Sequence, residues 1–345
     1  MRVQSMKLIA VLAITGLVAA ACSKKESSSN QETTAENESA GVVEVLDEEV
    51  TNLIDPSATL EVLGEGYKWS EGPVWVEEHQ FLLFSDVQTN TIHKWTEEEG
   101  VTTYLQPAGY TGEEERGGFL GSNGLFISND GHLLICQHGD HRIARMDAPL
   151  DDPAPEFTTL ADSYNGQRLH SPNDLVQHSS GDIYFTDPPY GYEEGPEAPE
   201  RELSPNGVYR LTTEGEVILL TDELSRPNGI DLSPDDKTLY VANSSAENPI
   251  WMAYDVTEDG NITNGRVFHD ASEFAGKVPG NQDGFDVDAD GNIYATGPGG
   301  IWIFAPDGRV LGKIKSGHSA NCTIGNNGNT LYITAEDRLL SIPLR

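Results

Sequence analysis

Polar residues followed by short apolar stretches recur along this chain at nearly regular intervals. Each apolar stretch leads into a Gly or Asp turn and then into an aromatic-rich strand, in which polar and apolar positions partly alternate. The polar residues that open the six stretches, called the openers below, are Glu71, Asn123, Asn173, Asn228, Asp283 and Asn321. Most openers lie about 50 residues apart, a period that indicates a repeated unit of sheet.

Each repeat contains the strands of one propeller blade. Second strands are predicted at 81–86, 132–138, 182–187, 238–244, 292–297 and 330–336, and third strands at 91–96, 142–147, 207–212, 250–256, 300–305 and 339–344. Outer strands are predicted at 101–105, 157–161, 216–221, 266–269 and 309–314, which leaves the sixth unit one strand short. Residues 59–63 can supply the missing strand. The sequence therefore predicts an all-β fold, a six-bladed β-propeller over residues 57–345 that is closed by pairing of its N-terminal strand with the C-terminal blade.

The N-terminus has the plan of a secretory signal, because Arg2 and Lys7 precede an apolar run over 8–21. The four residues 19–22 resemble a bacterial lipobox, with Ala19 where Leu is usual. We expect residues 1–22 to be a lipoprotein signal peptide with lipidated Cys22; ordinary cleavage and a plain membrane anchor are the alternatives. Residues 23–55, rich in Ser, Glu, Asn and Thr, are expected to form a disordered tether. The prediction is an exported bacterial lipoprotein of the periplasm or cell envelope, held at the membrane only by its lipid.

Charge narrows the range of partners. The chain has 21 Lys and Arg residues against 56 Asp and Glu residues, a formal net charge of −35, and no basic stripe. Nucleic acid is therefore not an expected partner. The acidic residues also keep an exported protein soluble. Cys136 and Cys322 are expected to be buried thiols, with one disulfide between them as the alternative.

The openers carry the candidate chemistry. Equivalent positions on the innermost strands of a propeller face one central axis, so the six polar groups should converge. Glu71 and Asp283 offer carboxylates, and Asn173 and Asn228 offer amide oxygens, which are donors that suit a hard divalent cation. Two neighbouring buried carboxylates are costly without such a cation. The alternative is that the Asn-Gly and Asp-Gly pairs only form turns, but Glu71 has no turn preference.

Motifs in a fixed order give the chain a family resemblance. They are Glu71-Gly72-Pro73-Val74-Trp75, Ser171-Pro172-Asn173-Asp174, the run 185–191 (FTDPPYG), Arg226-Pro227-Asn228-Gly229 and Asp283-Gly284. These resemble the senescence-marker-protein/gluconolactonase/luciferin-regenerating-enzyme family, and Asn321-Cys322 with 330–334 is similar to the last blade of its bacterial gluconolactonase branch. The resemblance covers residues 67–345. It implies a six-bladed propeller with one divalent metal in a central tunnel, which hydrolyses lactones of sugar acids.

The resemblance also implies roles for individual residues. Glu71, Asn228 and Asp283 would bind the metal, with Asn173 contacting the metal or the substrate and Asp174 the substrate. Ca²⁺ is the first choice of metal, with Mg²⁺, Mn²⁺ or Zn²⁺ as alternatives. Some members have an Arg two residues before the Asn of the second motif, where this chain has Ser171. The identity of the lactone therefore stays open.

The chemistry of these groups suggests a mechanism. The metal would polarise the lactone carbonyl while Asp283 takes a proton from the attacking water. Asn123, Asn173 and Asn321 would orient substrate hydroxyls, and His170 and His318 are further candidates for substrate contacts. Segment 191–206, rich in Glu and Pro, is either a lid or a solvated loop. Two other functions stay open: a non-catalytic binding or scaffold propeller of the envelope, and a phosphoester or organophosphate hydrolase.

Overall fold

The computed structural model describes residues 42–114 and 116–345. The expected signal peptide, Cys22 and the first part of the tether at 23–41 lie outside these residues. No helix in the described part of the chain is both long enough and apolar enough to span a bilayer.

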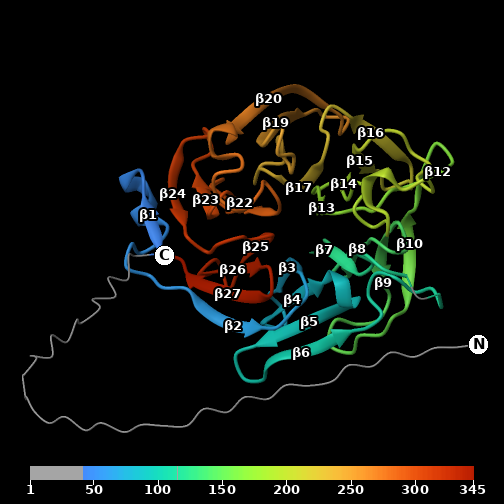
Figure 1. Cartoon of the computed structure of the whole chain (residues 1–345), viewed down its shortest axis with the longest axis horizontal. Helices are drawn as coiled ribbons and strands as arrows, with labels where there is room; N and C mark the ends of the chain where they lie inside the picture. The colour runs from blue at the N-terminus through green and yellow to red at the C-terminus, as the bar shows by residue number, and fades with distance from the viewer. Residues whose placement is uncertain (1–41, 115) are drawn as a thin grey trace, which may run out of the picture. The chain divides into compact units, whose positions relative to one another are not determined.

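Six antiparallel sheets form the blades of a β-propeller, as predicted (Figure 1). Blade one contains β3 (Ser70–Val76), β4 (Phe81–Asp86), β5 (Thr91–Thr96) and β6 (Gly100–Leu105), and blade two contains β7 (Ser122–Ile127), β8 (Leu133–Gln137), β9 (Arg142–Met146) and β10 (Phe157–Ala161). Blade three contains β13 (Leu175–Gln177), β14 (Ile183–Asp187), β15 (Gly207–Leu211) and β16 (Val217–Thr221), and blade four contains β17 (Pro227–Leu232), β18 (Thr238–Asn243), β19 (Ile250–Val256) and β20 (Ile262–Asp270).

The last two blades also take strands from the N-terminal segment. Blade five contains β21 (Phe285–Val287), β22 (Ile293–Gly297), β23 (Gly300–Phe304) and β24 (Val310–Ile314), with β1 (Val43–Val45) at its outer edge. Blade six contains β25 (Asn321–Gly325), β26 (Thr330–Ala335) and β27 (Arg338–Pro343), with β2 (Glu61–Glu65) outermost. The remaining elements are the small pair β11 (Ser163–Tyr164) and β12 (Gln167–Arg168) and the 3₁₀ turns η1 (Glu48–Asn52), η2 (Val87–Thr89), η3 (Gly195–Glu197) and η4 (Ser272–Phe274).

Strand β2 closes the ring. It pairs antiparallel with β27, and in Figure 1 the blue strand lies beside the red one at the seam between the two ends of the chain. The prediction that a segment near residues 59–63 completes the C-terminal blade is confirmed. Each innermost strand also contacts the next one around the ring, from β3 through β7, β13, β17, β21 and β25 back to β3.

The expectation that the tether extends to residue 55 is wrong for its last part. Residues 43–45 form β1, which pairs with β24, and η1 follows directly. Val50 and Ile54 are fully buried in the apolar core between blades five and six. Two buried aliphatic side chains give this short segment enough apolar contact to stay folded despite its polar composition.

The blades pack through apolar clusters, most of which lie between neighbouring sheets. Leu83, Ile135 and Met146, for example, join blades one and two. Cys136 and Cys322 are both buried free thiols, as expected. The first belongs to the cluster of blades two and three, and the second to that of blades five and six.

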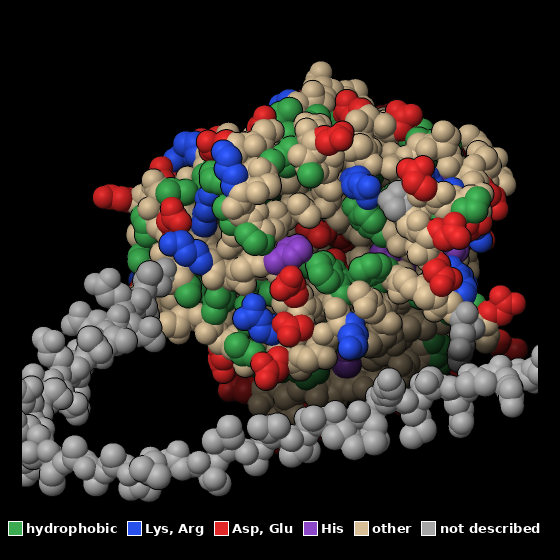
Figure 2. Space-filling view, viewed as in Figure 1, with side chains coloured by type: hydrophobic (Ala, Val, Ile, Leu, Met, Phe, Trp, Pro, Cys, Tyr) green, Lys and Arg blue, Asp and Glu red, His purple; other side chains and the backbone are tan. Residues whose placement is uncertain are grey.

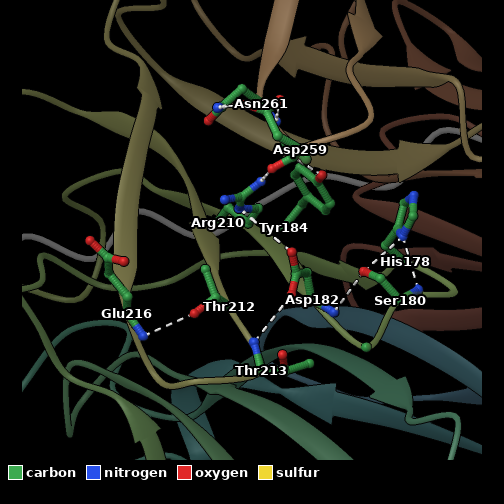
Figure 3. A network of polar contacts seen from close by, with 12 residues as sticks. His178, Ser180, Asp182, Tyr184, Arg210, Thr212, Thr213, Glu216, Asp259 and Asn261 are labelled. Carbon is green, nitrogen blue, oxygen red and sulfur yellow. Dashed lines mark hydrogen bonds and ion pairs between the residues drawn. The ribbon is translucent and has the colours of Figure 1, made fainter.

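Polar contacts join the blades as well. Between blades three and four, the buried Arg210 donates to the backbone carbonyl of Asp259 and forms an ion pair with Asp182 at 3.6 Å (Figure 3). The Tyr184 hydroxyl donates to the Gly260 carbonyl at 2.8 Å. Both acceptors lie in the β19–β20 turn, so two side chains of blade three hold a turn of blade four.

Candidate active site among the innermost strands

Five of the six openers line one cavity of about 560 Å³, called the main cavity below. They are Glu71, Asn123, Asn173, Asn228 and Asp283, from blades one to five in chain order. The other lining residues are Trp69, Gly118, Phe119, His138, Tyr190, Tyr192, Glu193, Gly195, Arg226, Ser244, Ala246 and Asn281. The molecular surface is hollowed near the middle of the face in Figure 2, with acidic and histidine side chains at the hollow. The convergence predicted for these five openers is therefore found.

The glycine that follows an opener lets neighbouring innermost strands approach closely. A Cβ atom at Gly72 would lie 2.0 Å from the Asn123 carbonyl oxygen, and one at Gly229 would lie 2.3 Å from that of Asp283. Both distances are far inside van der Waals contact. The opener-Gly pairs are thus explained by close packing around the axis, whereas the turn alternative does not account for these contacts.

Hydroxyl groups on the second strands hold the backbone of the openers. Ser85 on β4 donates to the Asn123 carbonyl at 2.8 Å, and Thr186 on β14 donates to the Asn228 carbonyl at 2.6 Å. Each of these bonds links one blade to the next. The innermost strands are therefore fixed to their neighbours at the level of the opener side chains, which keeps the cavity walls in place.

The loops that precede the openers are held by polar residues at the ends of second strands. The buried carboxylate of Asp86 accepts from the backbone N–H groups of Lys68 and Trp69, at distances of 3.0 to 3.2 Å. In blade four, the Asn243 side-chain oxygen accepts from the Arg226 N–H at 2.9 Å. These contacts place Trp69 and Arg226 at the cavity wall.

Burial and electrostatic repulsion both oppose ionisation of the carboxyl groups in the main cavity. Burial raises the pKa of Glu71 well above its usual value, and the nearby charge of Asp283 raises it further. Burial likewise raises the pKa of Asp283 to about 8, with a further rise from Asp174, while a hydrogen bond from Asn228 opposes the change. Two carboxyl groups that both resist ionisation need a cation nearby to be charged at neutral pH.

The donor set fits a hard divalent cation. Two carboxylates from blades one and five, with the amide oxygens of Asn173 and Asn228 between them, provide the oxygen ligands that Ca²⁺ and Mg²⁺ prefer. Over residues 42–114 and 116–345 no three His, Cys, Asp or Glu residues come together as metal ligands. A cation here would therefore depend on amide oxygens as well as on carboxylates.

The prediction that Asp174 and Asn321 contact the substrate alongside the other openers is not supported, because neither residue lines the main cavity. Both line a smaller cavity of about 120 Å³ further along the innermost strands, with Asp231 and Asp286 among its other residues. The Asn321 side chain bonds to Asp174 and accepts from the Cys322 N–H at 2.7 Å. These bonds turn the sixth opener away from the other five.

His170 and His318 also lie outside the lining of the main cavity. His170 is fully buried, and its Nε2 bonds to the Pro205 carbonyl at 3.0 Å. His318 stacks edge-on against Trp69 and pairs with Glu336 at 3.3 Å. The prediction of substrate contacts through these two histidines is therefore not supported by their positions.

His138 lines the main cavity and is almost fully buried, although the opener pattern does not mark it. Burial lowers the pKa of His138 to about 3, so the ring is neutral at physiological pH. Within the described part of the chain, neither ring nitrogen has a partner that meets hydrogen-bond geometry, although the nearby Phe119 backbone opposes the fall in pKa. Position alone, at the end of the second strand of its blade, could have pointed to this residue.

Two loops cover the cavity. Gly118 and Phe119 come from the loop before β7, and Tyr192, Glu193 and Gly195 come from the segment 191–206. The two loops also touch, since a Cβ at Gly117 would lie 3.0 Å from the Glu193 carboxylate. Segment 191–206 thus contributes wall to the cavity, which favours the lid over the solvated loop.

Comparison with known proteins decides the family. The sequence-family model of the SMP-30/gluconolactonase/LRE-like region matches residues 69–337. The chain belongs to this family. It is 39% identical over 297 residues to a gluconolactonase of Zymomonas mobilis, a match that covers 84% of this chain and 82% of the relative.

Solved structures of the same fold include other family members. A gluconolactonase of Xanthomonas campestris is 30% identical with a TM-score of 0.75, over 88% of this chain and 95% of that one. A regucalcin of Agrobacterium tumefaciens, described as a calcium-binding protein, superposes with a TM-score of 0.64 at 20% identity, over 83% of this chain and 95% of that one. The second likeness shows a shared fold.

Proposed function

We propose that this protein hydrolyses lactones of sugar acids at the main cavity, with the help of a divalent metal. The observation that carries the proposal is the meeting of Glu71 and Asp283 in one cavity beside the amide side chains of three other openers. The 39% identity to a gluconolactonase supports the choice of reaction. A cavity of about 560 Å³ is large enough for a monosaccharide lactone.

Glu71, Asn228 and Asp283 would hold the metal, with Asn173 completing the set. We propose Ca²⁺, because carboxylate and amide oxygens from several strands suit its variable coordination, and the calcium-binding regucalcin shares the fold. When bound, the ion supplies Lewis-acid polarisation of the lactone carbonyl.

The residues of the chain supply the rest of the reaction. Asp283, ionised in the metal-bound protein, takes a proton from the water that adds to the lactone carbonyl carbon. The ring C–O bond then breaks, and the released ring oxygen takes up a proton, so that one lactone and one water give one hydroxy acid. Asn123 and Asn173 donate hydrogen bonds to substrate oxygens, while Trp69 and Phe119 form an aromatic wall.

Assays with defined substrates test this proposal. The purified protein should hydrolyse glucono-1,5-lactone, and a chelator should abolish the activity until Ca²⁺ is restored. Asp283→Asn should lower kcat by about 10²- to 10⁴-fold, the usual contribution of a general base. Turnover of a phosphotriester but of no lactone would favour the phosphoester hydrolase. Metal binding without turnover of any substrate would favour a binding propeller.

The N-terminal prediction also stays a proposal. We propose that Cys22 is lipidated and holds the propeller at the membrane of the cell envelope. A Cys22→Ser variant should then move from the membrane fraction to the soluble fraction. If the variant stays in the membrane fraction, another part of the chain is the anchor.

A further inference from the structure

Among the described residues that line the main cavity, Arg226 is the one Lys or Arg. It lies two residues before Asn228, which is proposed above as a metal ligand. Its side chain is half-buried, so the guanidinium is accessible from the cavity. A cation at this wall faces the acidic side formed by Glu71 and Asp283.

No carboxylate of the described residues forms an ion pair with Arg226. Acidic residues outnumber basic ones, 56 to 21, and other arginines such as Arg142, Arg266 and Arg309 pair with carboxylates. Within the described ranges, however, Arg226 has no Asp or Glu oxygen within 4.0 Å. In so acidic a protein, an unpaired arginine at a cavity wall is available for an anionic ligand.

The position of Arg226 is fixed before any ligand arrives. Its backbone N–H donates to Asn243, and Pro227 restricts its backbone conformation. The guanidinium lies 5.8 Å from the ring centroid of Tyr190, close enough for a cation–π contact. Tyr190 is in turn hydrogen-bonded to Arg226 and Ser244. A preorganised guanidinium loses less entropy when it binds a planar anion.

Charge balance indicates what kind of ligand fits. A divalent ion would neutralise the carboxylates of Glu71 and Asp283, and His138 is neutral. Arg226 then leaves one positive charge inside the cavity. The remaining carboxylate of the lining, Glu193, is exposed at the covering loops and does not pair with Arg226. Tyr190 lines the same cavity, 5.8 Å from the Arg226 guanidinium and near enough to Asp283 for its charge to act on the Tyr190 hydroxyl.

We propose that Arg226 binds an anionic group of the substrate, so that the preferred substrate is a sugar lactone with a free carboxylate or phosphate besides its lactone ring. This proposal rests on the lactone hydrolysis proposed above. The lactone carbonyl would lie beside Asp283, and the anionic group would lie beyond Tyr190 at the guanidinium.

Steady-state kinetics with three substrates test the proposal. Glucono-1,5-lactone is neutral, glucaro-1,4-lactone carries a carboxylate, and 6-phosphogluconolactone carries a phosphate. For the wild-type protein, kcat/KM should be at least tenfold higher with one of the charged lactones, and that lactone identifies the anion. Arg226→Gln should lower kcat/KM for this lactone about 10- to 100-fold and for glucono-1,5-lactone less than threefold, mainly through KM.

Two further variants separate charge from structure. Arg226→Lys keeps the charge and should retain most of the preference. Arg145→Gln is the matched control, because Arg145 is also half-buried but pairs with Asp147 at 2.9 Å, does not line the main cavity and should leave the preference unchanged. The preference should also weaken as salt is raised.

Failure of this proposal can be told apart from failure of the proposed function. If no lactone is hydrolysed by the wild-type protein, the proposed function is wrong. If glucono-1,5-lactone is hydrolysed but the charged lactones are not preferred, only the role of Arg226 is wrong. An equal loss on neutral and charged lactones in Arg226→Gln would also overturn it, because Arg226 would then act on a step common to all lactones.

Discussion

Glu71 and Asp283 come from the first and fifth blades, yet the charge of Asp283 raises the pKa of Glu71 across the main cavity. This repulsion is a cost of folding that a bound cation would remove. We therefore expect the stability of the protein and its activity to respond in opposite directions when one of these charges is deleted.

Glu71→Gln should stabilise the metal-free protein. At pH 8 in the presence of a chelator, the free energy of unfolding should rise by about 1–3 kcal/mol, since a buried ionisable carboxyl is replaced by a neutral amide. With Ca²⁺ added, the wild-type protein should gain stability and the variant should gain little. Urea denaturation with and without Ca²⁺ measures both effects. Loss of stability in the metal-free variant would show that the Glu71 carboxyl is not repelled.

Affinity for Ca²⁺ should rise with pH. Because the pKa of Asp283 is raised to about 8, its carboxyl holds a proton at pH 6 to 7 that the metal must displace. The association constant should increase up to about tenfold per pH unit for each displaced proton between pH 6 and 8. Calorimetric titration in two buffers of different ionisation enthalpy counts the released protons. A constant affinity from pH 6 to 8 would contradict the raised pKa.

Gly229→Ala should damage the site through the backbone. The added Cβ would lie 2.3 Å from the Asp283 carbonyl oxygen, so the neighbouring strand must move. We expect a loss of about 1–3 kcal/mol in stability and a fall in kcat. Gly131→Ala is the control: its φ of +83° makes alanine cost about 1 kcal/mol, but nothing lies within 4 Å of the new atom. Activity normalised to folded protein should fall only in Gly229→Ala.

The N-terminal segment 43–54 should contribute measurably to stability. Ile54 is fully buried, so Ile54→Ala should lower the free energy of unfolding by about 2–5 kcal/mol. Leu46 in the same segment is 50% exposed, so Leu46→Ala should change the free energy of unfolding by about 0.5 kcal/mol or less. Thermal and urea denaturation compare the two variants. Equal effects would mean that the segment does not pack as described.

Acid should destabilise the protein through buried histidines. Burial lowers the pKa of His141 to about 4, whereas in the unfolded chain it is about 6.5. Between these values the unfolded state binds a proton that the folded state does not, so stability is lost as pH falls from about 6.5 to 4. His141→Asn suits the left-handed backbone at this position (φ 56°). Over this range, the stability of the variant should fall less steeply with pH than that of the wild-type protein. The two slopes should differ by up to about 1.4 kcal/mol per pH unit. An unchanged slope would mean that His141 titrates normally.

Much of the fold could be predicted because individual polar and turn residues mark each repeat in the sequence. The opener spacing and the turn residues locate the blades, and the shortage of one strand at residue 345 predicts the closure by β2. Segment 43–54 was missed because its six apolar residues alternate irregularly with acidic and other polar residues and follow a long polar stretch. Their burial depends on a groove between blades five and six that no local pattern reveals.

The site was predicted less completely, for a physical reason. Backbone position follows from the repeat, but the direction of a side chain depends on local bonds. Asn321 is an opener by sequence, yet its bonds to Cys322 and Asp174 turn it toward the smaller cavity. Arg226 and His138 reach the main cavity from the ends of loops and second strands, which the opener pattern does not mark.

The segment before the ring also has a mechanical consequence. The chain joins the propeller twice, first through β1 on blade five and then through β2 on blade six. A pull applied to the residues before 42 would therefore load β1 and η1 first. These short elements would separate from blade five while β2 stays paired with β27, so such a force would extend the segment before the ring without opening the ring.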